Sequence, residues 1–127
     1  MTIASPEKYM RALWDWGMFD GCFGNSRIKI GDIDGIVESR GHFLLIEGKS
    51  VGVPIPEGQR IMIGKLLEIP QFTIICLWGT PPNRINRIEV RNGKEVITIA
   101  HATIGDLRSV VAEWYAGTIH GPPKLAA

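Results

Sequence analysis

Residues 71–80, "QFTIICLWGT", constrain the fold of this chain most, because they form a nearly continuous run of apolar and β-branched side chains. The run is far shorter than the roughly 20 apolar residues that cross a bilayer. A strand that is apolar on both faces must be covered on both faces, as in the middle of an α/β sheet. We therefore expect helices to pack on a sheet that contains this strand.

The rest of the chain alternates between helical and strand patterns. Apolar spacing predicts helices over 5–19, 57–70 and 103–117. Period-2 alternation predicts a strand over 27–39, and a second strand follows the turn at 43–50. The apolar run adds a strand over 71–80, and an Asn-Gly turn predicts a hairpin over 87–100. The predicted order is helix, two or three strands, helix, strand, hairpin and helix, which favours one α/β domain over 1–127.

Composition and charge set limits on function. Lys and Arg number 14 against 13 for Asp and Glu, so the net charge of +1 does not by itself indicate a nucleic-acid-binding protein. The N-terminus has no basic region followed by an apolar core, so we expect no secretion signal and no membrane partner. Cys22 and Cys76 lie far apart in different contexts, which is typical of free thiols in a reducing cell. We expect a cytoplasmic protein.

Four charged residues interrupt the two strands predicted over 27–50, namely Asp32, Asp34, Glu47 and Lys49. Side chains two residues apart in a strand share a face, so Glu47 and Lys49 lie together, as do the two Asp side chains. Pairing of these strands can place an Asp carboxylate beside that of Glu47. Two close carboxylates resist joint ionisation, and a divalent cation stabilises them. All-oxygen ligands favour Mg²⁺ or Mn²⁺ over zinc.

These groups match the requirements of phosphodiester hydrolysis. A divalent metal activates water and neutralises the scissile phosphate. Lys49 supplies a fixed positive charge that can orient a water or hold a phosphate oxygen. Gly48, which lies between the acid and the lysine, leaves room for another element or a substrate backbone.

Asp34 followed by Glu-Gly-Lys-Ser at 47–50 resembles the signature of the PD-(D/E)XK nucleases, an Asp on one strand and Glu-x-Lys on its hairpin partner. The Glu-Gly-Lys-Ser run is also similar to that of Holliday-junction resolvases and related small nucleases. The core of that family, a helix, a three-strand meander, a helix and a strand, can be read over 5–79. Many members carry a Gln where Gln59 stands. The C-terminal hairpin and helix remain outside the resemblance.

The resemblance implies a restriction-endonuclease-like α/β fold, with a mixed central sheet flanked by helices (αβββαβ) plus a C-terminal hairpin and helix. It implies a Mg²⁺- or Mn²⁺-dependent deoxyribonuclease, acting as an endonuclease, of phage or mobile-element type. Such a protein binds DNA and acts as a homodimer or is recruited by a partner.

The same resemblance assigns roles to individual residues. Asp34 and Glu47 are implied to bind the metal, with the Gly48 carbonyl as a third ligand. Lys49 is implied to position or deprotonate the attacking water, and Gln59 to support Lys49 or the substrate. Two further acids are candidate ligands: Asp32, which is otherwise an exposed neighbour, and Glu7 of the first helix. The family's Pro-Asp dipeptide is absent, and we favour Asp34 over Asp32 because "DGIV" leads directly into apolar strand.

Other interpretations remain open. The acids and Lys49 could form a cross-strand salt bridge on a solvated sheet face. The chain could be a non-catalytic nucleic-acid-binding or assembly module that keeps the fold, and RNA could replace DNA as the substrate. Basic residues lie near the proposed site and in the C-terminal loop and hairpin, and are typical either of a phosphate track or of a charged sheet edge. They are Arg27, Lys29, Arg40, Arg60, Lys65, Arg84, Arg87, Arg91 and Lys94.

Overall fold

The computed structural model describes residues 13–120. The chain divides between Asp32 and Ile33 into two compact units. In the described part of the first unit, a short 3₁₀ helix, η1 (Trp16–Phe19), begins where the Asp15 carboxylate accepts a hydrogen bond of 2.9 Å from the Gly17 N–H. The rest of the helix predicted over 5–19 falls mainly outside the described residues. The single domain over 1–127 stays a prediction.

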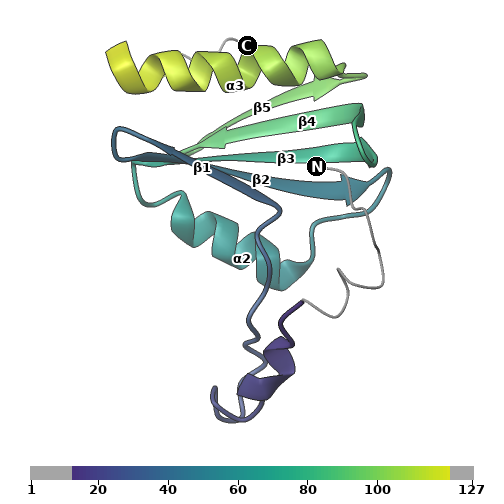
Figure 1. Cartoon of the computed structure of the whole chain (residues 1–127), viewed down its shortest axis with the longest axis vertical. Helices are drawn as coiled ribbons and strands as arrows, with labels where there is room; N and C mark the ends of the chain where they lie inside the picture. The colour runs from purple at the N-terminus through teal and green to yellow at the C-terminus, as the bar shows by residue number, and fades with distance from the viewer. Residues whose placement is uncertain (1–12, 121–127) are drawn as a thin grey trace. The chain divides into compact units, whose positions relative to one another are not determined.

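The second unit contains a five-stranded mixed sheet (Figure 1). Its strands are, in spatial order, β1 (Gly35–Ser39), β2 (His42–Ser50), β3 (Phe72–Thr80), β4 (Arg84–Asn92) and β5 (Glu95–Ala100). Strands β2 and β3 pair in parallel and all other neighbours pair antiparallel. The parallel pair is connected by α2 (Glu57–Leu66), and α3 (Ile104–His120) follows β5.

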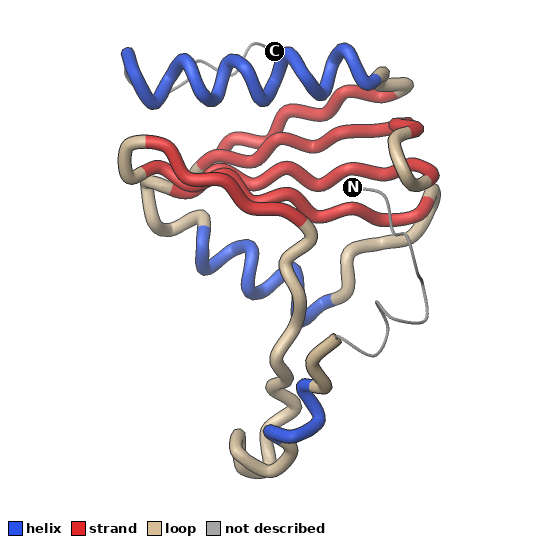
Figure 2. Tube along the Cα trace, viewed as in Figure 1, coloured by secondary structure: helices blue, strands red, loops and turns tan. Residues whose placement is uncertain are grey.

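The two helices cover opposite faces of this sheet (Figure 2). On one face Ile63 of α2 packs with Ile74 and Cys76 of β3. On the other face Trp114 of α3 packs with Ile75. The apolar run of β3 is therefore buried on both sides, because its alternate side chains enter two different cores. The predicted α/β class with helices on a mixed sheet is confirmed. Within residues 13–120 no helix combines the length and the apolar character needed to cross a membrane.

A two-residue turn fixes the register of the first hairpin. Ser39 pairs with His42, and the intervening Arg40 and Gly41 have φ angles of 51° and 81°. Positive φ at both central residues is typical of the turn that matches the twist of antiparallel strands. A one-residue slip would move every side chain of β2 to the opposite face, so this turn also decides where Glu47 points.

Some predicted boundaries were wrong. The strand expected over 27–39 is a strand only from Gly35, so within residues 13–120 the three-strand meander is a two-strand hairpin. Ile28 and Ile30 are 64% and 40% exposed, because alternation without a neighbouring strand buries neither face. The hairpin expected over 87–100 begins earlier, since β4 begins at Arg84, and the helix expected over 57–70 ends at Leu66. The Asn-Gly hairpin tip was correct.

Candidate active site

The hairpin register brings Asp34 next to Glu47. The β1–β2 ladder ends with Gly35 opposite Ile46, so Asp34 and Glu47 occupy the following position. Asp34 is exposed, and its Oδ2 accepts a hydrogen bond of 2.8 Å from the Gly48 N–H. The carboxylate thus satisfies a backbone donor just beyond the end of the ladder. This bond holds the Asp34 side chain against the segment that carries the Glu-x-Lys sequence.

Glu47 is a buried acid with an incomplete set of partners. It is 4% exposed, and its Oε2 accepts a hydrogen bond of 3.0 Å from the Gln59 amide nitrogen. Its Oε1 is buried and has no hydrogen-bond partner, and the same is true of the Gln59 Oε1. A buried carboxylate oxygen without a donor is costly, because it has lost its water without compensation. An unpartnered, buried carboxylate oxygen of this kind favours a bound cation.

The ionisation of Glu47 reflects this environment. Burial raises the pKa of the Glu47 carboxyl, and the negative charge of Asp34 raises it further. The Lys49 ammonium group acts in the opposite direction and lowers the pKa, but the net shift is upward. The repulsion between two neighbouring carboxylates, expected from the sequence, is therefore present at this site.

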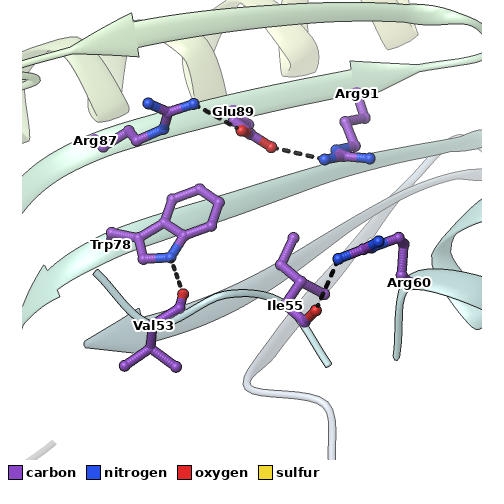
Figure 3. A network of polar contacts seen from close by, with 7 residues as sticks. All are labelled: Val53, Ile55, Arg60, Trp78, Arg87, Glu89 and Arg91. Carbon is purple, nitrogen blue, oxygen red and sulfur yellow. Dashed lines mark hydrogen bonds and ion pairs between the residues drawn. The ribbon is translucent and has the colours of Figure 1, made fainter. Parts of the chain in front are cut away.

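Glu89, a second acid on the same face of the sheet, differs from Glu47 in its partners and in its pKa. Glu47, Cys76 and Glu89 occupy one row across β2, β3 and β4. Glu89 accepts hydrogen bonds from Arg87 at 3.0 Å and from Arg91 at 2.7 Å, as Figure 3 shows. Although burial alone would raise the pKa of Glu89, these two guanidinium groups lower it overall. Glu89 is thus neutralised by the protein, whereas Glu47 is not.

Sequence reasoning missed this arginine network, although the Arg-x-Glu-x-Arg spacing of residues 87–91 places the three side chains on one face. The Arg87 guanidinium also lies 5.7 Å from the ring centroid of Trp78. The Trp78 indole donates a hydrogen bond of 2.6 Å to the Val53 carbonyl, and Arg60 donates one of 3.4 Å to the Ile55 carbonyl (Figure 3). These contacts hold the β2–α2 connection on the sheet and so position the start of α2.

The remaining predicted site residues have mixed outcomes. Gln59 lies in the first turn of α2, where it contacts Glu47; the predicted support of Lys49 is not among its hydrogen bonds. Asp32 belongs to the first unit, and its Oδ1 accepts a hydrogen bond of 2.9 Å from the Trp16 indole. Glu7 lies outside the described residues. Metal binding by Asp32 and by the Gly48 carbonyl stays a prediction.

The salt-bridge interpretation has no support in the described part of the chain. The ion pairs found between residues 13 and 120 join Lys65 to Glu68, and Arg87 and Arg91 to Glu89. Within this part of the chain, Asp34, Glu47 and Lys49 form none. Glu47 thus differs from Glu89, which two arginines neutralise.

Two carboxylates form the acidic part of this site. No group of three or more His, Cys, Asp and Glu side chains that could hold a metal occurs within the described residues. Mg²⁺ commonly uses one or two carboxylates and keeps several waters, so the pair of Asp34 and Glu47 suits it. The unpartnered Glu47 Oε1 and the oxygen-only donor set fit such an ion.

No family of known proteins, no curated protein and no solved structure matches this chain. The class of protein is therefore defined by the fold and the site together. It is an α/β protein with two neighbouring carboxylates at the end of a hairpin, one buried (Glu47) and one exposed (Asp34), and with an adjacent lysine.

The raised pKa of Glu47 predicts how stability depends on pH and metal. The folded chain holds the Glu47 proton more tightly than the unfolded chain, so this contribution to stability is complete below the unfolded pKa and is lost as pH rises through the folded one. At neutral pH without metal we expect Glu47→Gln to unfold at a higher temperature than the wild type. The amide carries no charge, so this variant avoids the cost of ionising a buried group at neutral pH.

Mg²⁺ should reverse this order. A ligand at 100 times its Kd stabilises the folded state by about 2.7 kcal/mol. At pH values above 7 we expect Mg²⁺ to raise the Tm of the wild type and to leave the Tm of Glu47→Gln unchanged. Thermal unfolding measured across pH checks this. The Glu89 contribution is common to both proteins and cancels in the difference. Equal Mg²⁺ shifts in both proteins would contradict a metal site at Glu47.

Proposed function

We propose that this protein is a metal-dependent nuclease of the PD-(D/E)XK type, with a restriction-endonuclease-like core, that hydrolyses DNA phosphodiester bonds. The observation that carries this proposal is the buried Glu47 Oε1, which has no partner although Asp34 lies beside it. We further propose that it acts in the cytoplasm as an endonuclease, as a homodimer or recruited by a partner.

Asp34 and Glu47 would hold Mg²⁺ or Mn²⁺. When bound, such an ion lowers the pKa of water and neutralises charge on the scissile phosphate. Gln59 keeps one oxygen of Glu47 occupied through its 3.0 Å hydrogen bond, which leaves the other oxygen for the ion. The Gly48 N–H orients Asp34 in the same way through Oδ2.

Lys49 would act on the proton of the attacking water and on the negative charge of a phosphate oxygen. It follows Glu47 by two residues in β2, so both side chains lie on the face that α2 covers. Its ammonium group is close enough to Glu47 to lower the pKa of that carboxyl. From there it can orient an attacking water and accept or share its proton.

A purely basic binding module is less consistent with the described residues. Arg87 and Arg91, which the sequence offered as a phosphate track, are both bonded to Glu89. A buried acid without a partner contributes nothing to binding phosphates. The nuclease proposal explains that acid, whereas the module does not.

The direct test is nicking of a supercoiled plasmid with Mg²⁺ or Mn²⁺. We expect the wild type to nick the plasmid, EDTA to stop the reaction and Glu47→Gln to be inactive while remaining folded. Cleavage of an RNA strand under the same metal conditions decides whether RNA or DNA is the substrate. Equal nicking by wild type and Glu47→Gln would mean that the activity is a contaminant or lies at another site. Binding of DNA without any metal-dependent nicking would favour the non-catalytic module.

A further inference from the structure

An open pocket of about 540 Å³ lies on the second unit, and Asp34 is among its lining residues whereas Glu47 is not. Lys49, Ser50, Asn83 and Arg84 also line it. Its volume is within the range of about 300–1,000 Å³ that is usual for small-molecule sites. We call it the strand-end pocket, because it lies where β2 and β3 finish.

The topology explains why a pocket forms here. Since β2 and β3 are parallel, their carboxyl ends meet at the same edge of the sheet, where ligands bind in open α/β sheets. The pairing of β3 with β4 shifts register between Trp78 and Gly79. This irregularity lets β4 begin immediately, with Arg84 opposite Thr80. Arg84, at the start of β4, thereby lines the same pocket as Ser50 at the end of β2.

The charges of this pocket suit a phosphate group. Arg84 is exposed, and among the ion pairs of residues 13–120 it has none, in contrast to Arg87 and Arg91. Lys49 adds a second cation. A smaller pocket of about 190 Å³ between α3 and the sheet has Asp106 and Glu113 as its charged residues and would repel phosphate.

The rest of the strand-end pocket is apolar. Its wall is made by the side chains of Ile46, Leu77, Pro81, Pro82 and Ile85. An apolar wall beside cations matches one nucleotide, whose base is flat and apolar on its faces and whose phosphate is anionic. A base paired inside a duplex cannot enter such a pocket without leaving its stack, which costs least where the base is already unpaired.

We propose that the strand-end pocket binds one unpaired DNA nucleotide next to the scissile phosphate, with Arg84 bound to its phosphate. This assignment rests on the proposed nuclease function and extends it to a substrate class. Single-stranded DNA, or a single-stranded segment of a larger DNA, is then preferred over a continuous duplex. Arg84 acts in substrate binding and selection, since it lies on β4 and not on the strands that carry the acids.

The test is binding to a fluorescein-labelled single strand and to its blunt duplex, measured by fluorescence anisotropy in EDTA so that no cleavage occurs. We expect the wild type to bind the single strand more tightly than the duplex. Arg84→Ala should weaken single-strand binding about tenfold, the loss of one charge-assisted phosphate contact. The slope of log K against log salt concentration is negative, and in Arg84→Ala it should be shallower by about 0.7.

Lys94→Ala is the matched control, because Lys94 is an exposed cation in the turn at the opposite end of β4. We expect its affinity to stay within about twofold of the wild type. Ser50→Leu, which fills the pocket without adding charge, should remove the preference for single strands and keep duplex binding. Equal effects of Arg84→Ala and Lys94→Ala, a preference for duplex or for RNA, or no binding at all would overturn the proposal.

The same oligonucleotides with Mn²⁺ separate this inference from the proposed function. Cleavage of both DNA forms at equal rates would retain the nuclease and discard the nucleotide pocket. Arg84-dependent binding to the single strand with no cleavage would retain the pocket and discard the nuclease.

Discussion

Lys49→Ala is expected to lower the rate of DNA cleavage at least about a hundredfold while leaving metal binding intact, since general acid–base groups contribute about 10²–10⁴ to rates. Glu47→Gln, in contrast, should lose both cleavage and the rise in Tm with Mg²⁺. The two residues lie on the same strand face, but we propose different roles for them. Cleavage rate and Mg²⁺-dependent Tm, measured on both variants, distinguish them.

The Lys49 charge also lowers the pKa of Glu47, so its removal should have a second effect. In Lys49→Ala the Glu47 proton is held more tightly, and the pH at which Mg²⁺ begins to raise Tm should move upward. Lys65→Ala serves as the control, because Lys65 is an exposed lysine in the last turn of α2. A Lys49→Ala protein that cleaves as fast as Lys65→Ala would remove Lys49 from the mechanism.

The fold class could be predicted from the sequence because a few local patterns are strong. The apolar run of β3 required two covering layers, and both helices after Pro56 had clear apolar stripes. Turn chemistry placed the hairpins, since Gly41 and Gly93 both have positive φ. What failed was the segment over 27–34, where alternation was present but no strand within residues 13–120 pairs with it. A strand forms only where a neighbouring strand pairs with it, and the sequence of residues 27–34 does not reveal whether such a neighbour exists.

The candidate site was predictable in part for the same reason. Residue spacing along the hairpin placed Asp34 beside Glu47, because register follows from a two-residue turn. The contact of Gln59 with Glu47 depends on how α2 packs on the sheet, which no local pattern gives. The strand-end pocket depends on a register shift between β3 and β4, and the sequence offered only a Pro-Pro loop there.

Gly79→Ala is expected to be the most destabilising small substitution near the site. A Cβ atom at Gly79 would overlap the Arg84 carbonyl oxygen and lie 3.1 Å from the Ile85 Cα. Both neighbours are backbone atoms of β4, so neither can turn away as a flexible side chain would. Overpacking of this kind costs about 1–3 kcal/mol, and the rigid backbone places Gly79 at the upper end. For a domain of this size we expect Tm to fall by about 10 °C or more.

Gly64→Ala is the control for the loss of a glycine. A Cβ atom added at Gly64 in α2 would meet no atom within 4 Å, so alanine there should stabilise the helix by about 0.5–1 kcal/mol. The two variants should therefore shift Tm in opposite directions. Because Gly79 lets β4 approach the end of β3, Gly79→Ala should also weaken single-strand binding at temperatures where it is still folded. A Gly79→Ala protein with the Tm of the wild type would mean that β3 and β4 do not approach each other as described, and Arg84 would then lose its place in the strand-end pocket.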